Sequence, residues 1–283
     1  MDSLKKYYRL AKPGMVYGNL ITAGAGYLLA SRLHLRLVSF LAMVVGVALL
    51  MGAACAFNNI IDRDIDILMQ RTKSRPSAVG TISFKSGMTF VFTLVLTASL
   101  LLLLCVNVLT FVIGAVGFID YALVYTFLKR KTRYSTLIGS IAGATPIIGG
   151  YTAYAGHITF SALIAGLMML FWQMPHFYAL ALYREKDYKK ARIPLLPIVK
   201  GHRSTLREMI FYNVLFSVAV FGLYFNAKLG WAYLLILGGA SLAWLGYNLK
   251  GTLKSVDLTS WAKQSFLYSL ALVVLMSLMV ALR

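Results

Sequence analysis

Three carboxylates lie within five positions of this chain, at the point where a long apolar run ends. They are Asp62, Asp64 and Asp66, and the whole chain of 283 residues has nine acidic residues. Carboxylates at the C-terminal end of a helix face the negative end of the helix dipole and repel one another. A bound divalent cation would remove both penalties. The cluster therefore predicts a metal site that holds an anionic ligand.

The spacing of these residues selects the ones that would bind the metal. If the helix continues beyond residue 57, Asn58, Asp62 and Asp66 form one stripe with steps of roughly 6 Å along the axis, and Asp64 faces elsewhere. Mg²⁺ typically takes one or two carboxylates together with substrate phosphates and water. An EF-hand calcium loop is excluded, because the chain has Ile and Lys where that loop needs Gly and Glu. A solvated helix end with local Asp–Arg pairs is the alternative.

Basic and aromatic residues follow the stripe in positions that suit a phosphate ligand. Tyr125 and Lys129 are four residues apart at the end of the fourth apolar run, on one helix face. Asp120 lies about two turns deeper, where a carboxylate is costly and is either functional or paired with a nearby Tyr or Lys. Guanidinium and ammonium groups that could hold phosphate oxygens follow the stripe directly: Arg71, Lys73 and Arg75.

A second candidate region lies in the sixth apolar run, where Pro175 interrupts an aromatic segment. Proline removes a backbone hydrogen bond and predicts a kink, which suits the wall of a cavity. His176 is predicted at membrane depth, either satisfied by a neighbour or acting as a ligand. In the loop that follows, Glu185 and Asp187 are metal or diphosphate groups, or else partners for nearby lysines. The candidate substrate-binding residues here are Trp172, Gln173, His176, Tyr178, Arg184, Asp187, Lys200 and His202.

The composition is that of an all-α polytopic membrane protein. Hydrophobic residues make up 59 % and charged residues 13 %, with a mean hydropathy of +0.75, whereas soluble domains have about 25 % charged residues. Cys55 and Cys105 lie far apart in apolar runs and are predicted packing residues. Nine stretches approach the roughly 20 residues that a membrane-spanning helix needs. They are 16–31, 38–57, 88–106, 108–127, 137–155, 160–183, 209–226, 231–249 and 265–282.

Loop charges predict the orientation. All but four of the 28 Lys and Arg residues lie in loops on one side, or in the segment before the first span: 1–15, 58–87, 128–136, 184–208 and 250–264. The positive-inside rule places these segments and the N-terminus in the cytoplasm, and nine spans place the C-terminus outside. Topology and anionic lipid headgroups account for the net charge of +19, so nucleic acid is not an expected partner.

The short loops predict a single domain over residues 1–283. Residues 18–26 and 137–144 are both small-residue stretches that enter the membrane from the cytoplasm. Small residues let transmembrane helices approach closely. This weak internal echo suggests halves at about 10–130 and 131–250, followed by a ninth helix.

The combined motifs resemble the heme-modifying farnesyltransferases of the UbiA superfamily of intramembrane prenyltransferases. The resemblance runs from about residue 9 to the last span. No single motif carries it, but the combination is specific. The motifs are Lys12-Pro13-Gly14, Asn58-Asn59-x-x-Asp62-Arg63-Asp64-Ile65-Asp66, Arg71-Thr72-x-x-Arg75-Pro76, Leu137-Ile138-Gly139-Ser140, Trp172-Gln173-Met174-Pro175-His176, Asp187-Tyr188 and Ile193-Pro194-Leu195-Leu196-Pro197.

The resemblance implies a nine-helix bundle in the bacterial inner membrane, with an active site near the cytoplasmic face under the loops after spans two and six. Mg²⁺ would bridge a prenyl diphosphate and the stripe of Asn58, Asp62 and Asp66, with Asp187 as a further candidate ligand. Tyr125 and Lys129 would match the superfamily's Tyr-x-x-x-Lys element. Position 183 is Tyr, where most members carry a further Asp. That departure leaves the number of metal ions open.

The implied reaction transfers a farnesyl group from farnesyl diphosphate to a vinyl group of heme B, with addition of water, giving heme O and diphosphate. Heme B would be a substrate, with His176 the first candidate for contact with its iron and His202 the second. Membrane lipid and heme-modifying or terminal oxidase assembly proteins are the implied partners. The alternatives are a prenyltransferase of the same fold with a quinone-type aromatic acceptor and, from a different class, a transporter.

Overall fold

The computed structural model describes residues 3–253 and 256–282, and within these ranges every regular element is helical. The predicted all-α class is therefore confirmed. Two of the elements, labelled η, are π-helices. In chain order the elements are α1 (Ser3–Leu10), α2 (Pro13–Ser31), α3 (Leu37–Ile61), α4 (Arg63–Asp66), α5 (Phe84–Cys105), α6 (Val108–Phe118), η1 (Ile119–Tyr125), α7 (Thr126–Leu128), α8 (Ser135–Ala155), α9 (Phe160–Tyr183), α10 (Glu185–Lys190), α11 (Leu196–Ala227), η2 (Tyr233–Gly238), α12 (Gly239–Lys250) and α13 (Leu258–Leu282).

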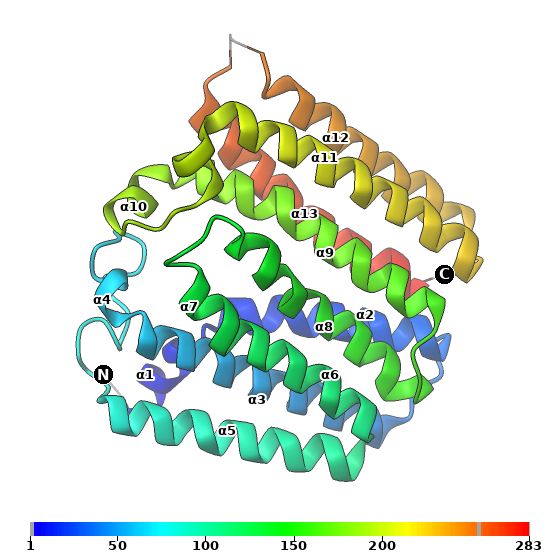
Figure 1. Ribbon diagram of the computed structural model, residues 1–283. Helices are drawn as coiled ribbons and strands as arrows, with labels where there is room; N and C mark the ends of the chain where they lie inside the picture. The colour runs from blue at the N-terminus through cyan, green and yellow to red at the C-terminus, as the bar shows by residue number, and fades with distance from the viewer. Residues whose placement is uncertain (1–2, 254–255, 283) are drawn as a thin grey trace.

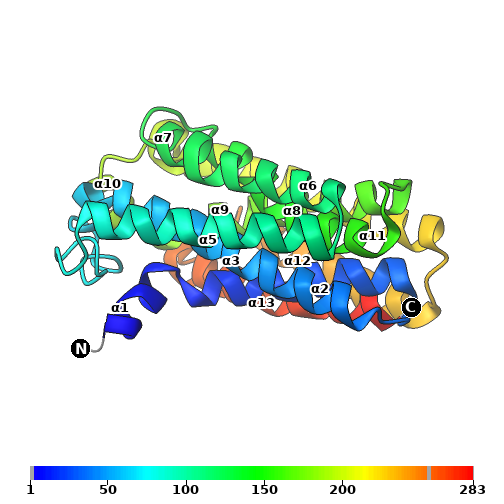
Figure 2. The same cartoon turned by 90° about the horizontal axis from the view of Figure 1, so that it is seen from below.

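The long helices lie side by side in a bundle (Figure 1). The short helices α1, α4, α7 and α10 gather at one end of the bundle, and α13 ends at the other (Figures 1 and 2). The loop that contains residues 67–83 lies at the same end as the short helices. Segments far apart in the sequence therefore meet at one end of the molecule.

Six helical segments of the described residues are long and apolar enough to cross a membrane: Leu37–Ile61, Phe84–Cys105, Val108–Leu128, Phe160–Tyr183, Leu196–Ala227 and Leu258–Ala281. Seven of the nine predicted ranges fall within a helix or a run of consecutive helices, while 88–106 extends one residue beyond α5 and 231–249 begins two residues before η2. The three predicted spans outside the six segments correspond to α2, α8 and η2–α12. The small and polar residues of α2 and α8 lower their hydropathy. The multi-pass class is confirmed, while nine crossings and the orientation stay predictions.

The two small-residue helices α2 and α8 pack directly against each other. A Cβ atom added at Gly26 would collide with the backbone carbonyl of Ile147, and one added at Gly150 would collide with that of Ala23. Contact between backbones at this range is the arrangement that small residues permit in membrane helices. The residues of the predicted internal echo therefore lie on helices that form a close-packed pair at the centre of the bundle.

Several local features differ from the sequence predictions. The helical backbone of α9 runs through Pro175, so the helix is not broken there, and the kink at this residue stays a prediction. Helix α11 starts before the predicted span and contains Gly201 at φ 77°, a conformation that glycine adopts without a Cβ penalty. Cys55 is buried as predicted, but Cys105 is exposed at the end of α5, so its assignment as a packing residue is wrong.

Candidate active site

The stripe predicted after the second span forms as a helical continuation. The backbone N–H of Asp62 donates to the carbonyl of Asn58 (2.9 Å), and that of Asp66 donates to the carbonyl of Asp62 (2.8 Å). The i, i+4, i+8 spacing therefore holds across the junction of α3 and α4. Asn58, Asp62 and Asp66 are each no more than 2 % exposed, whereas the side chain of Asp64 is 61 % exposed. The stripe faces inward and Asp64 faces solvent.

Basic side chains from other elements bind both buried carboxylates. Lys129, after α7, forms an ion pair with Asp62, and Arg130 donates to the other oxygen of Asp62 at 3.2 Å. Arg75, from the loop after α4, donates through Nη1 to both oxygens of Asp66, at 2.8 and 2.9 Å. Buried carboxylates are tolerated when they are paired and hydrogen-bonded, and these pairs meet that condition.

The amide of Asn58 is held from two further directions. The ammonium of Lys12 donates to Asn58 Oδ1 at 2.6 Å, and Asn58 Nδ2 donates to the hydroxyl of Thr126 at 2.9 Å. Lys12 lies in the turn between α1 and α2, and Thr126 begins α7. The segment before the first predicted span, the end of α3 and the end of the fourth predicted span therefore contribute side chains to the same end of the bundle.

Two tyrosines form the inner wall beside these groups. The rings of Tyr121 and Tyr125 stack with their centroids 5.3 Å apart. The Lys129 ammonium lies 5.5 Å from the Tyr125 ring centroid, and that of Lys12 lies 5.9 Å from the Tyr121 ring centroid, distances typical of cation–π contacts. A Cβ at Gly139 would come within 2.7 Å of the Tyr125 ring, so glycine in α8 leaves room for this wall.

The loops after the second and sixth spans pack against each other over the site. The carboxylate of Asp187 accepts from the backbone N–H of Gln70 at 3.4 Å, and the Arg71 guanidinium lies near the Tyr188 hydroxyl. An apolar cluster formed by Ile65, Met69, Ala191 and Ile193 joins the same two loops. Asp187, in α10, therefore contacts the loop that follows the stripe.

Burial and charge shift the pKa values of several groups at this end of the bundle. Burial of its ammonium lowers the pKa of Lys12 to about 7, although the side chain as a whole is only partly buried. Burial also lowers the pKa of Lys129, and the contact with Asp62 opposes that change. The hydrogen bond from Arg130 lowers the pKa of the exposed Asp64 carboxyl. Both amine groups are thus shielded from water, and the attraction between their charged forms and an anion is stronger there than at an exposed position.

The donor set fits Mg²⁺ shared with a phosphate ligand. Within the part of the chain that the structure describes, no group of three His, Cys, Asp or Glu side chains could hold a metal by itself. The stripe instead offers two buried carboxylates and an amide oxygen beside four cations. Mg²⁺ is commonly held by one or two carboxylates with the rest of its ligands from substrate phosphates and water.

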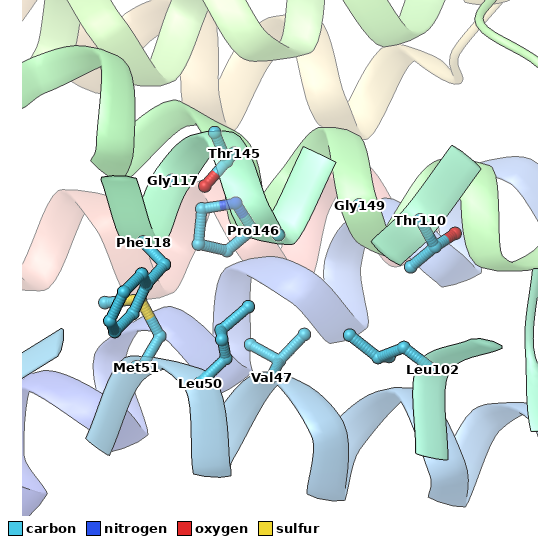
Figure 3. Close-up of a pocket in the computed structure, with 11 residues that line it drawn as sticks. Val47, Leu50, Met51, Leu102, Thr110, Gly117, Phe118, Thr145, Pro146 and Gly149 are labelled. Atoms are coloured by element: carbon cyan, nitrogen blue, oxygen red, sulfur yellow. The ribbon is translucent and has the colours of Figure 1, made fainter. Parts of the chain in front are cut away.

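An apolar pocket lies deeper in the bundle between α3, α5, α6 and α8 (Figure 3). Its cavity volume is about 20 Å³, so a larger apolar group enters only if the side chains lining it move. Leu50 and Met51 of α3 line it two turns before Asn58, and Phe118 of α6 lines it two turns before Tyr125. The pocket therefore lies on the same helices as the polar groups, on the membrane side of them.

The second candidate region has a different environment from the stripe. Trp172 and His176 are buried in α9, and the His176 ring is stacked between the rings of Trp172 (4.7 Å) and Phe266 (4.8 Å). Trp172 Nε1 donates to the carbonyl of Ser269 in α13. Gln173 donates to the carbonyls of Ser140 and Met169. These side chains join α9 to α8 and α13.

Hydrogen bonding around His176 identifies its tautomer. The Ser269 hydroxyl donates to the carbonyl of Phe266 at 2.6 Å, so it accepts from His176 Nδ1, also at 2.6 Å. His176 therefore carries its proton on Nδ1 and the lone pair on Nε2. This is the form in which histidine binds a metal, with the other nitrogen oriented by a hydrogen bond.

The remaining predicted residues of this region are dispersed. Tyr178 donates to Glu208 of α11 at 2.9 Å, and His202 is paired with Glu185 at 2.7 Å. Arg184 stacks on Tyr183. Lys73 and Lys200 are exposed. The structure does not bring these side chains together with the stripe through any contact among the described residues.

Asp120 has a partner in α8, within the membrane-spanning region. Its Oδ2 accepts from the backbone N–H of Ala142 at 3.0 Å. The Ala142 carbonyl accepts from Thr145 at 2.8 Å, since Pro146 has no N–H to donate to it. Asp120 thus joins η1 to the part of α8 that contains the proline, and among the described residues neither a Tyr nor a Lys is its hydrogen-bond partner.

Four residues of the site were not among the predicted ones. Arg130 follows Lys129 directly, and Lys12 precedes the first apolar run. In the sequence, each of these two residues is a basic residue at the end of a span. The positive-inside rule already accounts for such residues, so neither was selected as a site residue. Thr126 and Tyr121 carried no separate signal, because their roles depend on the helix face that the π-helix η1 presents.

Comparisons with known proteins identify relatives of this chain. The profile of the UbiA prenyltransferase family matches residues 19–270. A protoheme IX farnesyltransferase from Yersinia pseudotuberculosis (serotype O:1b, strain IP 31758) is 39 % identical over 279 residues, which cover 98 % of this chain and 94 % of that protein. One of the same name from Protochlamydia amoebophila (strain UWE25) is 40 % identical over 272 residues, which cover 96 % of each chain.

Solved structures share the fold. A digeranylgeranylglyceryl phosphate synthase superposes with a TM-score of 0.79 at 19 % identity, over 98 % of this chain and 99 % of that one. A UbiA homolog from Archaeoglobus fulgidus bound to GPP and Mg²⁺ superposes with a TM-score of 0.73 at 15 % identity, over the same shares of the two chains. Together with the full-length relatives, these matches show that the chain belongs to the UbiA prenyltransferase family.

Proposed function

We propose that this protein transfers the farnesyl group of farnesyl diphosphate to a vinyl group of heme B, with addition of water, to give heme O and diphosphate. The observation that carries the proposal is the identity of 39–40 % to protoheme IX farnesyltransferases over nearly the whole of both chains. The buried stripe of Asn58, Asp62 and Asp66 beside basic side chains supports it, because a prenyl diphosphate needs this combination of groups.

The stripe would hold the diphosphate end of the substrate. Asp62 and Asp66, with Asn58, are the ligands that would bind Mg²⁺, which would neutralise the diphosphate and make it a better leaving group. Arg75 and Lys129 would donate to the phosphate oxygens as negative charge grows on them. Arg71 and Lys73, in the loop after α4, would also donate to the phosphate oxygens. Asp187 would orient that loop or add a metal ligand.

The apolar pocket would take the first part of the farnesyl chain. It lies about two turns, or roughly 11 Å, deeper along α3 and α6 than the polar groups. Tyr125 and Tyr121 would flank the allylic carbon between the two regions, where their rings exclude water from the developing cation. Leu102 and Phe118, which line the pocket (Figure 3), would move to admit the chain.

The porphyrin would be bound by the aromatic segment of α9. The Nε2 lone pair of His176 would contact the heme iron, and Trp172, Gln173 and Tyr178 would position the ring. The basic side chains after α9, with Arg184, Lys200 and His202 among them, would pair with the propionates. This assignment is supported by the tautomer that Ser269 imposes on His176.

The active site would face the cytoplasm of a bacterial cell from its inner membrane. The bias of Lys and Arg toward the loops at the α4–α10 end supports this orientation. Farnesyl diphosphate is water-soluble at its head and lipid-soluble at its tail, so a site at the membrane surface suits it. The product would pass to heme-modifying or terminal oxidase assembly proteins.

The proposal is tested with purified protein, heme B and farnesyl diphosphate. We expect a product with the mass of heme O that forms with Mg²⁺ and is lost with a chelator. A parallel reaction offers a hydroxybenzoate or quinol acceptor in place of heme B. Prenylation of that acceptor, with heme B left unmodified, would overturn the proposed acceptor but not the prenyltransferase class.

A further inference from the structure

Each oxygen-bearing residue of the stripe is bonded to a basic side chain from a different part of the chain. Lys12 holds Asn58, Lys129 and Arg130 hold Asp62, and Arg75 holds Asp66. Metal ligands and phosphate-binding cations are therefore paired with each other. A divalent cation must take these oxygens from their partners, and it must do so beside positive charges.

Lys12 has the most constrained position among these cations. Its backbone has φ 51° and ψ 66°, a left-handed conformation that is unfavourable for a residue with a Cβ, and Pro13 follows it. The amide of Asn59 fixes the preceding turn by donating to the carbonyl of Leu10 at 2.8 Å. Such strained residues cluster at functional sites, where the surrounding structure holds them.

Lys12 also lies close to the other cations of the site. Its ammonium is near enough to Arg75 and Lys129 to be repelled by both, and near enough to Asp62 to be attracted. A diphosphate between these groups would give all three cations an anionic partner. The same event would free Asn58, Asp62 and Asp66 for a metal.

We propose that Lys12 is a diphosphate-binding residue. Without a ligand, Lys12, Lys129 and Arg75 bind the oxygens of the stripe. When a diphosphate binds these cations, the oxygens become free for Mg²⁺, so that Mg²⁺ and the prenyl diphosphate bind cooperatively. The inference rests on the proposed function of the same site. Because binding couplings are reciprocal, diphosphate raises the affinity for Mg²⁺ by the same factor by which Mg²⁺ raises the affinity for diphosphate.

The test is calorimetric titration of the purified full-length protein. The affinity for Mg²⁺ is measured with and without inorganic diphosphate, and the ratio of the two is the coupling factor. In Lys12→Met, Mg²⁺ alone should bind at least as tightly as in the unmodified protein, because one repulsive charge is gone. The coupling factor should fall about tenfold, the value expected for a lost charged hydrogen bond. An undiminished coupling factor would overturn the inference.

Two further variants separate charge from folding. Lys85→Met removes an exposed lysine at the start of α5 and should leave the coupling factor unchanged. Lys12→Arg keeps the charge and should retain most of it, which also serves if Lys12→Met does not fold. Complete loss in folded Lys12→Arg would show that side-chain shape decides, against the proposal. Since titration needs no heme, cooperative binding without heme O formation would contradict only the proposed function.

Discussion

Two neighbouring carboxylates in one short segment differ in environment because of where their side chains point. Asp62 is buried against Lys129 and Arg130. Asp64, two residues later, is mostly exposed and shares only Arg130. A helical step of two residues turns a side chain by about 200°, so alternate residues of this segment face opposite directions. The pair offers a comparison in which charge and sequence position are nearly matched.

We expect Asp62→Ala to lower farnesyl transfer by at least about a hundredfold, since a bound metal contributes several kcal/mol to such a step. Asp64→Ala should stay within about fivefold of the unmodified protein, because exposed ion pairs contribute about 0.2–1 kcal/mol. Initial rates with saturating Mg²⁺ measure both. Equal losses in the two variants would show that the cluster acts only as a structural unit.

The two histidines proposed to contact the heme iron also differ in burial. His176 is buried with its Nε2 lone pair defined by Ser269, whereas His202 is on the surface beside Glu185. His176→Ala should shift the Soret band of heme bound to the purified protein, and His202→Ala should not. An unchanged spectrum in His176→Ala would remove this residue as the iron ligand.

Among the elements, the α2–α8 pair decides how the two predicted halves of the molecule meet. Backbone contact at Gly26 and Gly150 brings the first and fifth predicted spans together. On either side of this pair, α3 brings the stripe and α9 brings the aromatic segment toward the same end of the bundle (Figure 1). Each half also contains a π-helix in its last long segment, η1 and η2. This parallel is consistent with the two predicted halves, which stay a prediction.

This close backbone contact predicts that adding a single methyl group has a large effect on the stability of the protein. Gly26→Ala should destabilise the protein by about 3 kcal/mol, since the added Cβ meets backbone that cannot move aside. Gly24→Ala, on the same helix with nothing within 4 Å of the added atom, should be neutral or slightly stabilising. Thermal unfolding in detergent compares the two. A stable Gly26→Ala protein would contradict the close packing.

At the scale of the whole molecule, the charged loops and the stripe lie at one end and the predicted outer loops lie at the other (Figures 1 and 2). A lipid-facing surface surrounds the bundle between them: the exposed residues of α5, for example, include Phe92, Leu96 and Leu104. This separation of polar ends from an apolar belt is what a bilayer requires of a multi-pass protein.

The orientation can be measured with cysteines at the two ends. In a Cys105→Ser background, which keeps only the buried Cys55, Ser74→Cys and His157→Cys introduce exposed thiols at opposite ends. A membrane-impermeant maleimide should label position 157 in intact spheroplasts and position 74 only in inverted vesicles. The opposite pattern would reverse the predicted topology.

The sequence alone determined the class of the protein and predicted the residues of the proposed diphosphate site. Hydropathy predicts membrane spans because each helical span pairs its own backbone N–H and C=O groups. The helical period places Asn58, Asp62 and Asp66 on one face without reference to the rest of the chain. The resemblance to a family came from the same local motifs. These features depend on short stretches, which is why they could be predicted.

The tertiary structure decided which distant groups complete the site. Lys12 is separated from its partner by 46 positions and Arg130 from its partners by 66 to 69 positions, and no local pattern relates them. The inward direction of His176, its tautomer, and the partner of Asp120 likewise depend on α13 and α8. Burial in the membrane makes each charged group take a partner, and only the packing of the helices determines which partner is within reach.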